Sequence, residues 1–468
     1  MKKKTIGSEE LLSRTYRRLA SMVVALALLA LHDKMSSAQI NESGRPSIQL
    51  TLKRAVEMAM QHNRQITLAR LATADSREKL AIAKSLYYPR ITNQSSALYL
   101  SDVQGVVLPA GVLSSSPTTG LIPSQTIRIG QGAQDTFTSS TALVQPLTQL
   151  IKVRAGEKAA QSDVKAAQFT QSDAENSIAL LVYKLYFGIL ASQSQLQADQ
   201  ASVLAAETKD EEGRRGVAEG KALEVVSLQN HVQLLDQRQS VLKTRISLED
   251  AMLQLDDALG LPLGTKLELD PSVMDDEAQL SSRATAMEAI RTHSPKVLEA
   301  QQTVEKAKAG LTAARAAYIP NITGTASYSY QNGVPFLVHN FGTFGGIVSF
   351  DLFDGGAREA KVREAKIELD MAQTKLDAAT AEASISIATA YDQVEQLKEL
   401  VNVAKEALQA KSEAVRVSQE RLSQNAEMLS GVAKSQSEVA SQKASLLQAE
   451  LSLILAERNI RQILGERP

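Results

Sequence analysis

The chain contains no cysteine and no tryptophan, and aromatic residues make up only 4% of its 468 positions. Without cysteine it can form no disulfide bond and cannot be lipidated at an N-terminal cysteine. So few aromatic side chains favour long helices packed through small residues over compact domains with a bulky core. The 51 basic and 52 acidic residues nearly cancel, and a net charge of −1 provides no basic surface to attract nucleic acid.

The N-terminus has the pattern of a secretory signal peptide. Basic residues at 2–4 and 17–18 precede the apolar run 22–31, and Ser36-Ser37-Ala38 supplies small residues for a cleavage site. That run is too short to span a bilayer. We therefore predict a signal peptide over 1–38, and export of a mature chain that begins near Gln39.

A segment of 40 residues occurs twice. Residues 53–92 return as 284–323 without a gap, with ten identical positions, and both copies end in Tyr-x-Pro-x-Ile-Thr. In each copy an Ala/Lys/Glu-rich stretch runs into Pro89 or Pro320, and a Ser/Thr-rich stretch leaves it. Proline lacks the N–H that a helix interior needs and pushes the preceding residue towards extended geometry. We predict a helix-to-strand junction at both prolines.

Charge nearly disappears after each junction. The windows 90–147 and 321–354 contain only six charged residues, although 22% of the whole chain is charged. They combine Ser and Thr with scattered aromatics, which is typical of strands with one face towards lipid and one towards water. A soluble hairpin is the alternative. We predict two strands in each copy, and a loop on the external side over 105–134, which is rich in Gly, Pro and Ser.

Four strands cannot close a membrane barrel, because small transmembrane barrels have at least about eight. An open sheet in lipid would leave the backbone groups at its edges unpaired, at several kcal/mol each. If these strands lie in a membrane, the barrel must be shared between chains.

Very long helices follow each strand pair. Proline-free stretches at 151–213 and 357–420 precede returning helices at 222–259 and 427–464, and a first helix is expected over 53–86. The returning helices carry apolar residues at seven-residue steps, as in a coiled coil, and each ends in Leu-Gly, a common helix stop. The residues at these steps are Leu234, Val241, Leu248 and Leu255 in the first returning helix, and Val432, Val439, Leu446, Leu453 and Ile460 in the second. We predict a mostly α fold with a small β part, in two structural repeats (39–260 and 284–468) joined by a connector (261–283).

This order of elements resembles the TolC-type outer-membrane factor (outer membrane efflux protein) family. The resemblance covers nearly all of the mature chain, from about 47 to 465. It rests on the two Tyr-x-Pro-x-Ile-Thr junctions, on Gln145-Pro146-Leu147, on Asp351-Leu352-Phe353-Asp354-Gly355-Gly356 and on the two Leu-Gly ends.

The resemblance implies a homotrimer, in which three chains make a twelve-stranded barrel in outer-membrane lipid and an α-helical tunnel into the periplasm. Members serve as exit ducts of tripartite efflux pumps and type I secretion systems. They dock a periplasmic adaptor that joins them to an inner-membrane transporter, which supplies the energy. No cofactor and no chemical transformation are implied.

In this family the periplasmic mouth lies at the turns between long and returning helices. The pattern there is Arg-Tyr-x-x-Gly, followed six residues later by Asp. In the first turn Arg214 matches the arginine, Ala218 stands in the place of the glycine, and Glu224 replaces the aspartate. In the second turn Arg421 matches the arginine and Asn425 stands for the glycine. The resemblance implies retained tips without the tyrosine and ion-pair latch of some members.

The tips are also acidic. Three copies each of Glu219, Glu224 and Glu427 around one axis would form a ring that favours cations, and such acids would repel one another unless basic neighbours offset them. The alternative is that these are ordinary solvated turn charges.

The sequence shows no pattern of a metal site or of an enzyme. The histidines of the mature chain, at positions 62, 231, 293 and 339, lie in separate segments without a metal-binding spacing, and no nucleophile–base pairing is legible. We expect no metal site and no enzyme.

A periplasmic adaptor or a coiled-coil scaffold would also be exported and helical, but neither explains a duplicated helix–strand–helix unit.

Overall fold

The computed structural model describes residues 48–101, 105–116, 118, 120–130, 133–271, 280–333 and 338–467. The predicted signal peptide lies outside them. The chain divides into two units. Among the described residues the smaller unit comprises 48–49 and 265–268, where strands β1 (Ile48–Leu50) and β8 (Leu267–Leu269) pair. Everything described below belongs to the larger unit.

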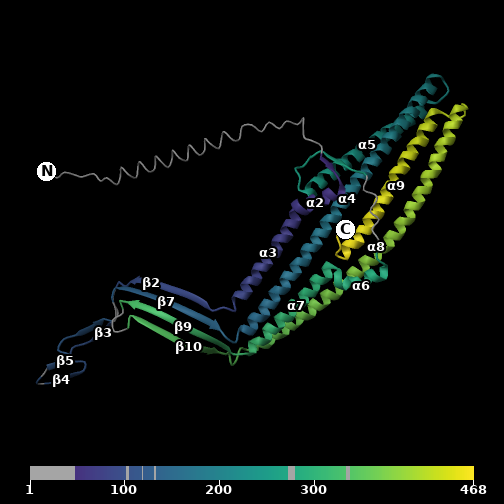
Figure 1. The fold of residues 1–468 in the computed structure, drawn as a ribbon. Helices are drawn as coiled ribbons and strands as arrows, with labels where there is room; N and C mark the ends of the chain where they lie inside the picture. The colour runs from purple at the N-terminus through teal and green to yellow at the C-terminus, as the bar shows by residue number, and fades with distance from the viewer. Residues whose placement is uncertain are drawn as a thin grey trace, which may run out of the picture. The chain divides into compact units, whose positions relative to one another are not determined.

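The larger unit repeats one series of elements (Figure 1). The first series is α2 (Leu52–His62), α3 (Arg64–Ser85), β2 (Arg90–Tyr99), β7 (Asp135–Pro146), α4 (Leu150–Ala218) and α5 (Glu224–Leu259). The second is α6 (Arg283–His293), α7 (Pro295–Arg315), the short helix η2 (Ala316–Tyr318), β9 (Asn321–Asn332), β10 (Asn340–Ser349), α8 (Ala357–Ser423) and α9 (Leu429–Ile463). The predicted mostly α architecture is confirmed.

The first helix of each copy is broken, whereas the sequence predicted one continuous helix over 53–86. Asn63 ends α2 with extended backbone, and its side chain accepts hydrogen bonds from the backbone N–H of Gln65 and Ile66 at the start of α3. Ser294, at the equivalent place in the second copy, is also extended and precedes Pro295 at the first position of α7. Both breaks use residues that favour a helix start.

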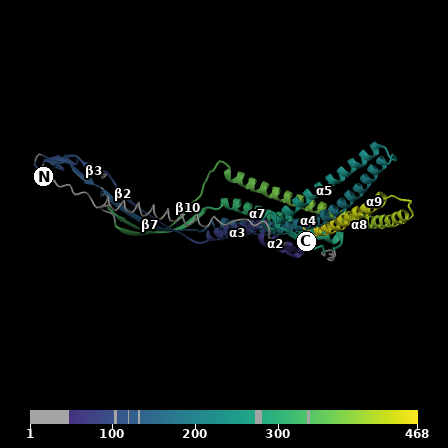
Figure 2. The same ribbon diagram turned by 90° about the horizontal axis from the view of Figure 1, so that it is seen from above.

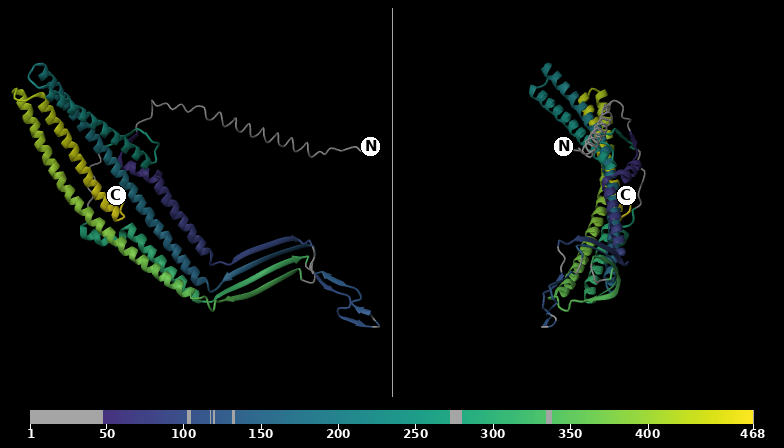
Figure 3. Two further views of the ribbon diagram at one scale, coloured as in Figure 1. Left: turned by 180° about the vertical axis from the view of Figure 1, so that it is seen from behind. Right: turned by 90° about the vertical axis from the view of Figure 1, so that its left-hand side faces the viewer.

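Four strands form one antiparallel sheet in the order β10–β9–β7–β2 (Figure 3). Strands β2 and β10 are its edges. The segment predicted as a loop over 105–134 contains two further strand pairs, which corrects that prediction. They are β3 (Gly105–Leu108) with β6 (Ile127–Gly130), and β4 (Ser114–Ser116) with β5 (Gly120–Ile122). Val106 and Val107 in β3 and Ile127 and Ile129 in β6 favour strands, despite the turn residues around them.

The longest helices of the chain form two hairpins, α4–α5 and α8–α9 (Figure 2). Helix α4 packs against α3, α5, α7 and α9. Small buried residues such as Ala179, Ala198 and Ala205 let these long helices approach closely. An 18-residue stretch of α4 is apolar enough to cross a membrane, but 44% of it is buried inside the chain, so we assign it to the helical core. Of the predicted seam residues, Leu234, Leu255, Val432 and Ile460 are buried, and Val241, Leu248, Val439, Leu446 and Leu453 are half-buried.

Tyr186 anchors the middle of α4. Its side chain is fully buried, and its hydroxyl lies 2.8 Å from the backbone oxygen of Leu50 and 2.9 Å from that of Asp270. Burial raises the pKa of Tyr186 to about 12, so the phenol stays neutral. Through these contacts Tyr186 ties the connector, at Asp270, to the start of the first repeat, at Leu50.

Candidate channel mouth and helix–strand junctions

The first helical tip is a tight turn around Gly220. The residue has the left-handed conformation (φ 68°), and the backbone N–H of Lys221 donates to the oxygen of Gly216 at 2.8 Å. The sequence comparison placed Ala218 at the position of the family's glycine. In the structure Ala218 is the last residue of α4, and Gly220 makes the turn. The sequence comparison was therefore two residues out of register here.

The second tip has the same geometry around Asn425. It is the one non-glycine residue with a left-handed backbone in the part of the chain that the structure describes (φ 54°), and Ala426 N–H donates to the oxygen of Arg421 at 2.8 Å. Asn tolerates this conformation better than other side chains. Arg421 thus corresponds to Gly216 and not to Arg214, so the motif's arginine is present in one tip only.

Arg214 points back into its own hairpin. Its guanidinium donates to Asp210 one turn earlier in α4, with Nε at 3.1 Å from Oδ2, and His231 Nδ1 lies 3.5 Å from the same oxygen. The Asp210 side chain is 1% exposed. The Arg214 hydrogen bond holds the pKa of Asp210 below its ordinary value, against the opposing effect of burial. Sequence reasoning missed Asp210 because nothing in the sequence marks it as buried.

The acidic tip residues differ in their surroundings. Glu219 pairs with Lys221 at 2.7 Å, which offsets its charge. Glu224 is the first residue of α5, where the helix dipole stabilises an acidic side chain. Glu427 accepts a hydrogen bond from Met428 N–H at 3.3 Å and lies beside Gly431, where a Cβ would contact its carboxylate. Gly431 therefore leaves room for Glu427.

One hydrogen bond joins the two tips. The Glu212 side chain on α4 accepts from the backbone N–H of Ser430 at the start of α9, at 3.0 Å. The carboxylate thus satisfies a free donor at a helix N-terminus. Because this bond joins the end of α4 to the start of α9, Glu212 is a positioning residue for both tips, and no motif identified it.

We expect Arg214→Gln to loosen the first tip. The Asp210 Oδ1 atom has no hydrogen-bond partner among the described residues, so loss of Arg214 leaves a buried carboxylate with fewer donors, at about 1–3 kcal/mol. Because the pKa of Asp210 is lowered on folding, its stabilisation is present above about pH 4 and is lost as the pH falls through its folded pKa. Hydrogen exchange of residues 205–235 between pH 7 and 3 measures this loss.

Arg215→Gln is the matched control, because Arg215 pairs at 3.1 Å with an exposed Glu211. Such surface pairs contribute about 0–1 kcal/mol. Equal exchange in the two variants would contradict the role of the buried pair.

Both prolines lie between a helix and a strand. Pro89 separates the end of α3 from β2, and Pro320 separates η2 from β9. Thr148 Oγ1 donates to the oxygen of Pro320 at 2.7 Å and accepts from Ile322 N–H at 2.8 Å. Near Pro89, Tyr87 donates its hydroxyl to Glu157 at 2.8 Å. Thr148, just before α4, and Glu157, near the start of α4, therefore hold the two junctions in place.

A cation stacks at the start of α8. The guanidinium carbon of Arg358 lies 5.0 Å from the ring centre of Phe350 and 5.7 Å from that of Tyr318. Its Nε donates to Asp354 at 2.7 Å, and another nitrogen donates to the oxygen of Asp351 at 2.8 Å. The Asp354–Gly356 turn is thereby held against the second junction.

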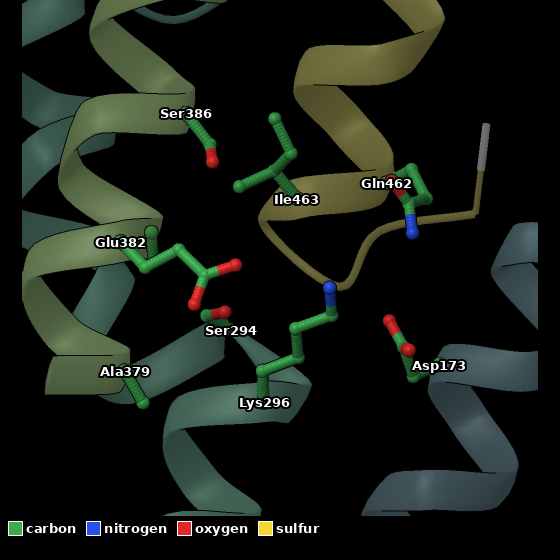
Figure 4. Close-up of a pocket in the computed structure, with 9 residues that line it drawn as sticks. Asp173, Ser294, Lys296, Ala379, Glu382, Ser386, Gln462 and Ile463 are labelled. Atoms are coloured by element: carbon green, nitrogen blue, oxygen red, sulfur yellow. The ribbon is translucent and has the colours of Figure 1, made fainter. Parts of the chain in front are cut away.

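A small polar cleft lies between α4, α7, α8 and the end of α9 (Figure 4). The Lys296 side chain extends between the carboxylates of Asp173 and Glu382. Burial raises the pKa of Asp173, and Lys296 opposes that effect. The volume is about 70 Å³, enough for a few water molecules only. We therefore assign the cleft to the helical framework and not to cargo.

Comparison with known proteins connects this geometry to one family. The model of the outer membrane efflux protein family matches residues 55–261 and 286–466. The probable efflux pump outer membrane protein SepC of Pseudomonas putida is 27% identical over 229 residues, which are 48% of this chain and 46% of SepC. The match thus spans about half the length of the curated relatives.

Solved structures share the fold. The CmeC outer membrane channel of Campylobacter jejuni superposes with a TM-score of 0.73 at 15% identity, covering 92% of this chain and 91% of CmeC. The outer membrane protein VceC of Vibrio cholerae gives a TM-score of 0.69 at 17% identity, covering 89% of this chain and 96% of VceC. The family and fold are those of channel proteins of the outer membrane, which confirms the predicted family and location. The chain belongs to the outer membrane efflux protein family.

Proposed function

We propose that three copies of this chain form the exit duct of a tripartite efflux pump or type I secretion system in the outer membrane. The duct is passive and performs no chemistry. An inner-membrane transporter supplies the energy, and a periplasmic adaptor docks at the helical tips formed by residues 214–224 and 421–427. The open sheet is the observation that carries this proposal.

The sheet has two unpaired edges, β2 and β10, and both strands are exposed along their whole length. In lipid each unsatisfied backbone group costs several kcal/mol. Four strands cannot curl into a barrel on their own. Three chains bring β2 of one copy against β10 of the next, and the resulting twelve strands leave no edge.

Helix α5 offers a second contact surface, which we call the α5 stripe. Its seven apolar residues follow steps of three, four or seven and are each 42–60% exposed: Val225, Leu228, Val232, Leu235, Leu242, Ile246 and Leu253. They lie away from the seam with α4, where Leu234 and Leu255 are buried. A stripe with this spacing is a coiled-coil seam without its partner. We assign its partner to a helix of the adjacent copy, because three chains that share one barrel also place their helices next to one another.

The proposal also covers the ends and the boundaries. Residues 1–38 serve as the signal peptide, and the two repeats span 39–260 and 284–468. At the mouth, Glu224 and Glu427 would form the acidic ring, whereas Glu219 is offset by Lys221. Arg421 has no ion-pair partner among the described residues, so it remains available to a neighbouring chain or an adaptor.

A periplasmic adaptor and a periplasmic scaffold are disfavoured by the sheet. Neither would expose Tyr328 and Phe344 on a charge-poor four-stranded surface, where these side chains are 59% and 83% exposed. Large exposed aromatic groups are costly in water and favourable in lipid.

Membrane fractionation tests this function. The chain is expressed with residues 1–38, inner and outer membranes are separated, and detergent extracts are compared unheated and boiled. We expect an outer-membrane species of about three times the mass of the mature chain before boiling, and the single mature chain afterwards; the mature chain lacks residues 1–38 of the 50.5 kDa full chain. A soluble periplasmic monomer would contradict the proposal.

A further inference from the structure

The strand register divides the side chains of the sheet into two chemically different faces. Successive residues of a strand point to opposite faces, and paired residues share a face. From these pairings we infer that one face is the water-filled wall of the barrel and that Arg90 is the residue that sets its ion preference. This inference rests on the proposed channel, and it adds which residues meet the cargo.

The first face, which we call the aromatic face, carries five of the six aromatic residues in the four paired strands: Tyr99, Phe137, Tyr328, Tyr330 and Phe344. Phe137 and Tyr330 are in contact, with ring centres 6.0 Å apart. Side chains on this face also include Ile91, Leu143 and Val348. Aromatic and aliphatic groups face lipid in membrane barrels.

Polar groups on the aromatic face satisfy one another. Asn93 donates to Thr141 Oγ1 at 2.8 Å, and Ser95 donates to the side-chain oxygen of Asn93 at 2.8 Å. A polar side chain next to lipid needs such a partner, since no water is present to replace it. These bonds make the aromatic face compatible with lipid despite its polar residues.

The opposite face, which we call the hydroxyl face, carries eleven serine or threonine residues, against three on the aromatic face. They are Thr92, Ser96, Thr136, Thr138, Ser140, Thr323, Thr325, Ser327, Ser329, Thr343 and Ser349. Ser140 and Ser329 hydrogen bond across β7 and β9 at 2.9 Å. Apart from Arg90, the paired residues of this wall offer hydrogen bonds and no charge, so it suits neutral and amphipathic cargo as well as ions.

Arg90 is the one charged residue on the hydroxyl face within the paired strand residues. It begins β2 next to Pro89, opposite Val144, and it is exposed without an ion-pair partner among the described residues. In a trimer, three guanidinium groups would surround the opening where the barrel meets the helices. Rings of basic side chains attract anions and repel cations. Arg90 would therefore favour anions at this level of the duct.

Thiol accessibility tests the assignment of the faces, and the cysteine-free sequence makes this direct. Ser327→Cys and Ser329→Cys lie on the hydroxyl face, and the adjacent Ala326→Cys and Tyr328→Cys lie on the aromatic face. In protein reconstituted into phosphatidylcholine vesicles, we expect a charged, membrane-impermeant methanethiosulfonate to modify the first pair and to spare the second. The reverse pattern in vesicle-inserted protein would overturn the inference alone. Equal modification of both pairs in protein that does not float with the vesicles would overturn the channel as well.

Reversal potentials in planar bilayers under a KCl gradient test Arg90. We expect Arg90→Gln to shift the potential towards cation preference, and Arg90→Lys to retain the potential of the original chain. Ile91→Gln changes the next residue, on the aromatic face, and is expected to cause no shift. An unchanged potential in Arg90→Gln, or the same shift in Ile91→Gln, would overturn the role of Arg90.

Discussion

Replacement of Ile246 by glutamate is expected to abolish the heat-resistant trimer. Ile246 belongs to the α5 stripe and is 60% exposed in the single chain. Burial of such a side chain at an interface contributes about 1.5–3 kcal/mol, and a trimer contains three copies. The Ile246→Glu variant lacks this contribution and places an unpaired charge in an apolar seam. The single chain should still fold, because the side chain does not belong to its core.

The matched control is Ser247→Glu, which adds the same charge to the neighbouring exposed residue, outside the stripe. Unheated gels and light scattering of detergent extracts should show trimers for Ser247→Glu and monomers for Ile246→Glu. Trimers in both variants would mean that the α5 stripe is not the contact between copies.

Replacement of Gly465 or Gly260 by valine is expected to prevent stable folding. Both residues end a returning helix in the left-handed conformation, with φ of 76° and 71°. A Cβ at Gly465 would lie 2.5 Å from the backbone oxygen of His293, and one at Gly260 would lie 2.8 Å from that of His62. The left-handed backbone alone costs about 1–2 kcal/mol, and more for a β-branched residue, and the contact with rigid backbone adds to it.

Gly310→Ala provides the control, because Gly310 lies within α7 and a Cβ there meets nothing within 4 Å. Replacement of glycine by alanine in the middle of a helix stabilises the folded chain by about 0.5–1 kcal/mol. The thermal unfolding midpoint and the yield of assembled protein measure these effects. Near-normal yield and midpoint for Gly465→Val would contradict the close packing of the Leu-Gly ends on the first helices.

These glycines also show why much of the fold could be predicted. The Leu-Gly ends and the equivalent His62 and His293 are visible as repeats in the sequence, and the structure shows that each glycine packs on one of these histidines. Local rules sufficed for the proline junctions, the long helices and their ends. Such features depend on a residue's own backbone preference, which a sequence displays directly.

The errors arose where a side chain acts on a distant or irregular backbone. Asn63 breaks the first helix because its amide also donates to the backbone oxygen of Ala258 at 2.9 Å, which lies far away in the sequence. The first tip was misplaced because α4 continues to Ala218 and the turn is made by Gly220. Glu212, Asp210 and Arg358 were missed, since only the folded chain brings their partners near.

The most direct test of a barrel shared between chains is a disulfide between its edge strands. Gln94→Cys on β2 is combined in turn with Phe341→Cys, Thr343→Cys and Gly345→Cys on β10, all on the hydroxyl face, in a chain that has no other cysteine. After mild oxidation in outer membranes, we predict linked dimers and trimers for at least one pair, and none for the single variants. Membrane-inserted protein that stays monomeric with every pair would contradict the shared barrel.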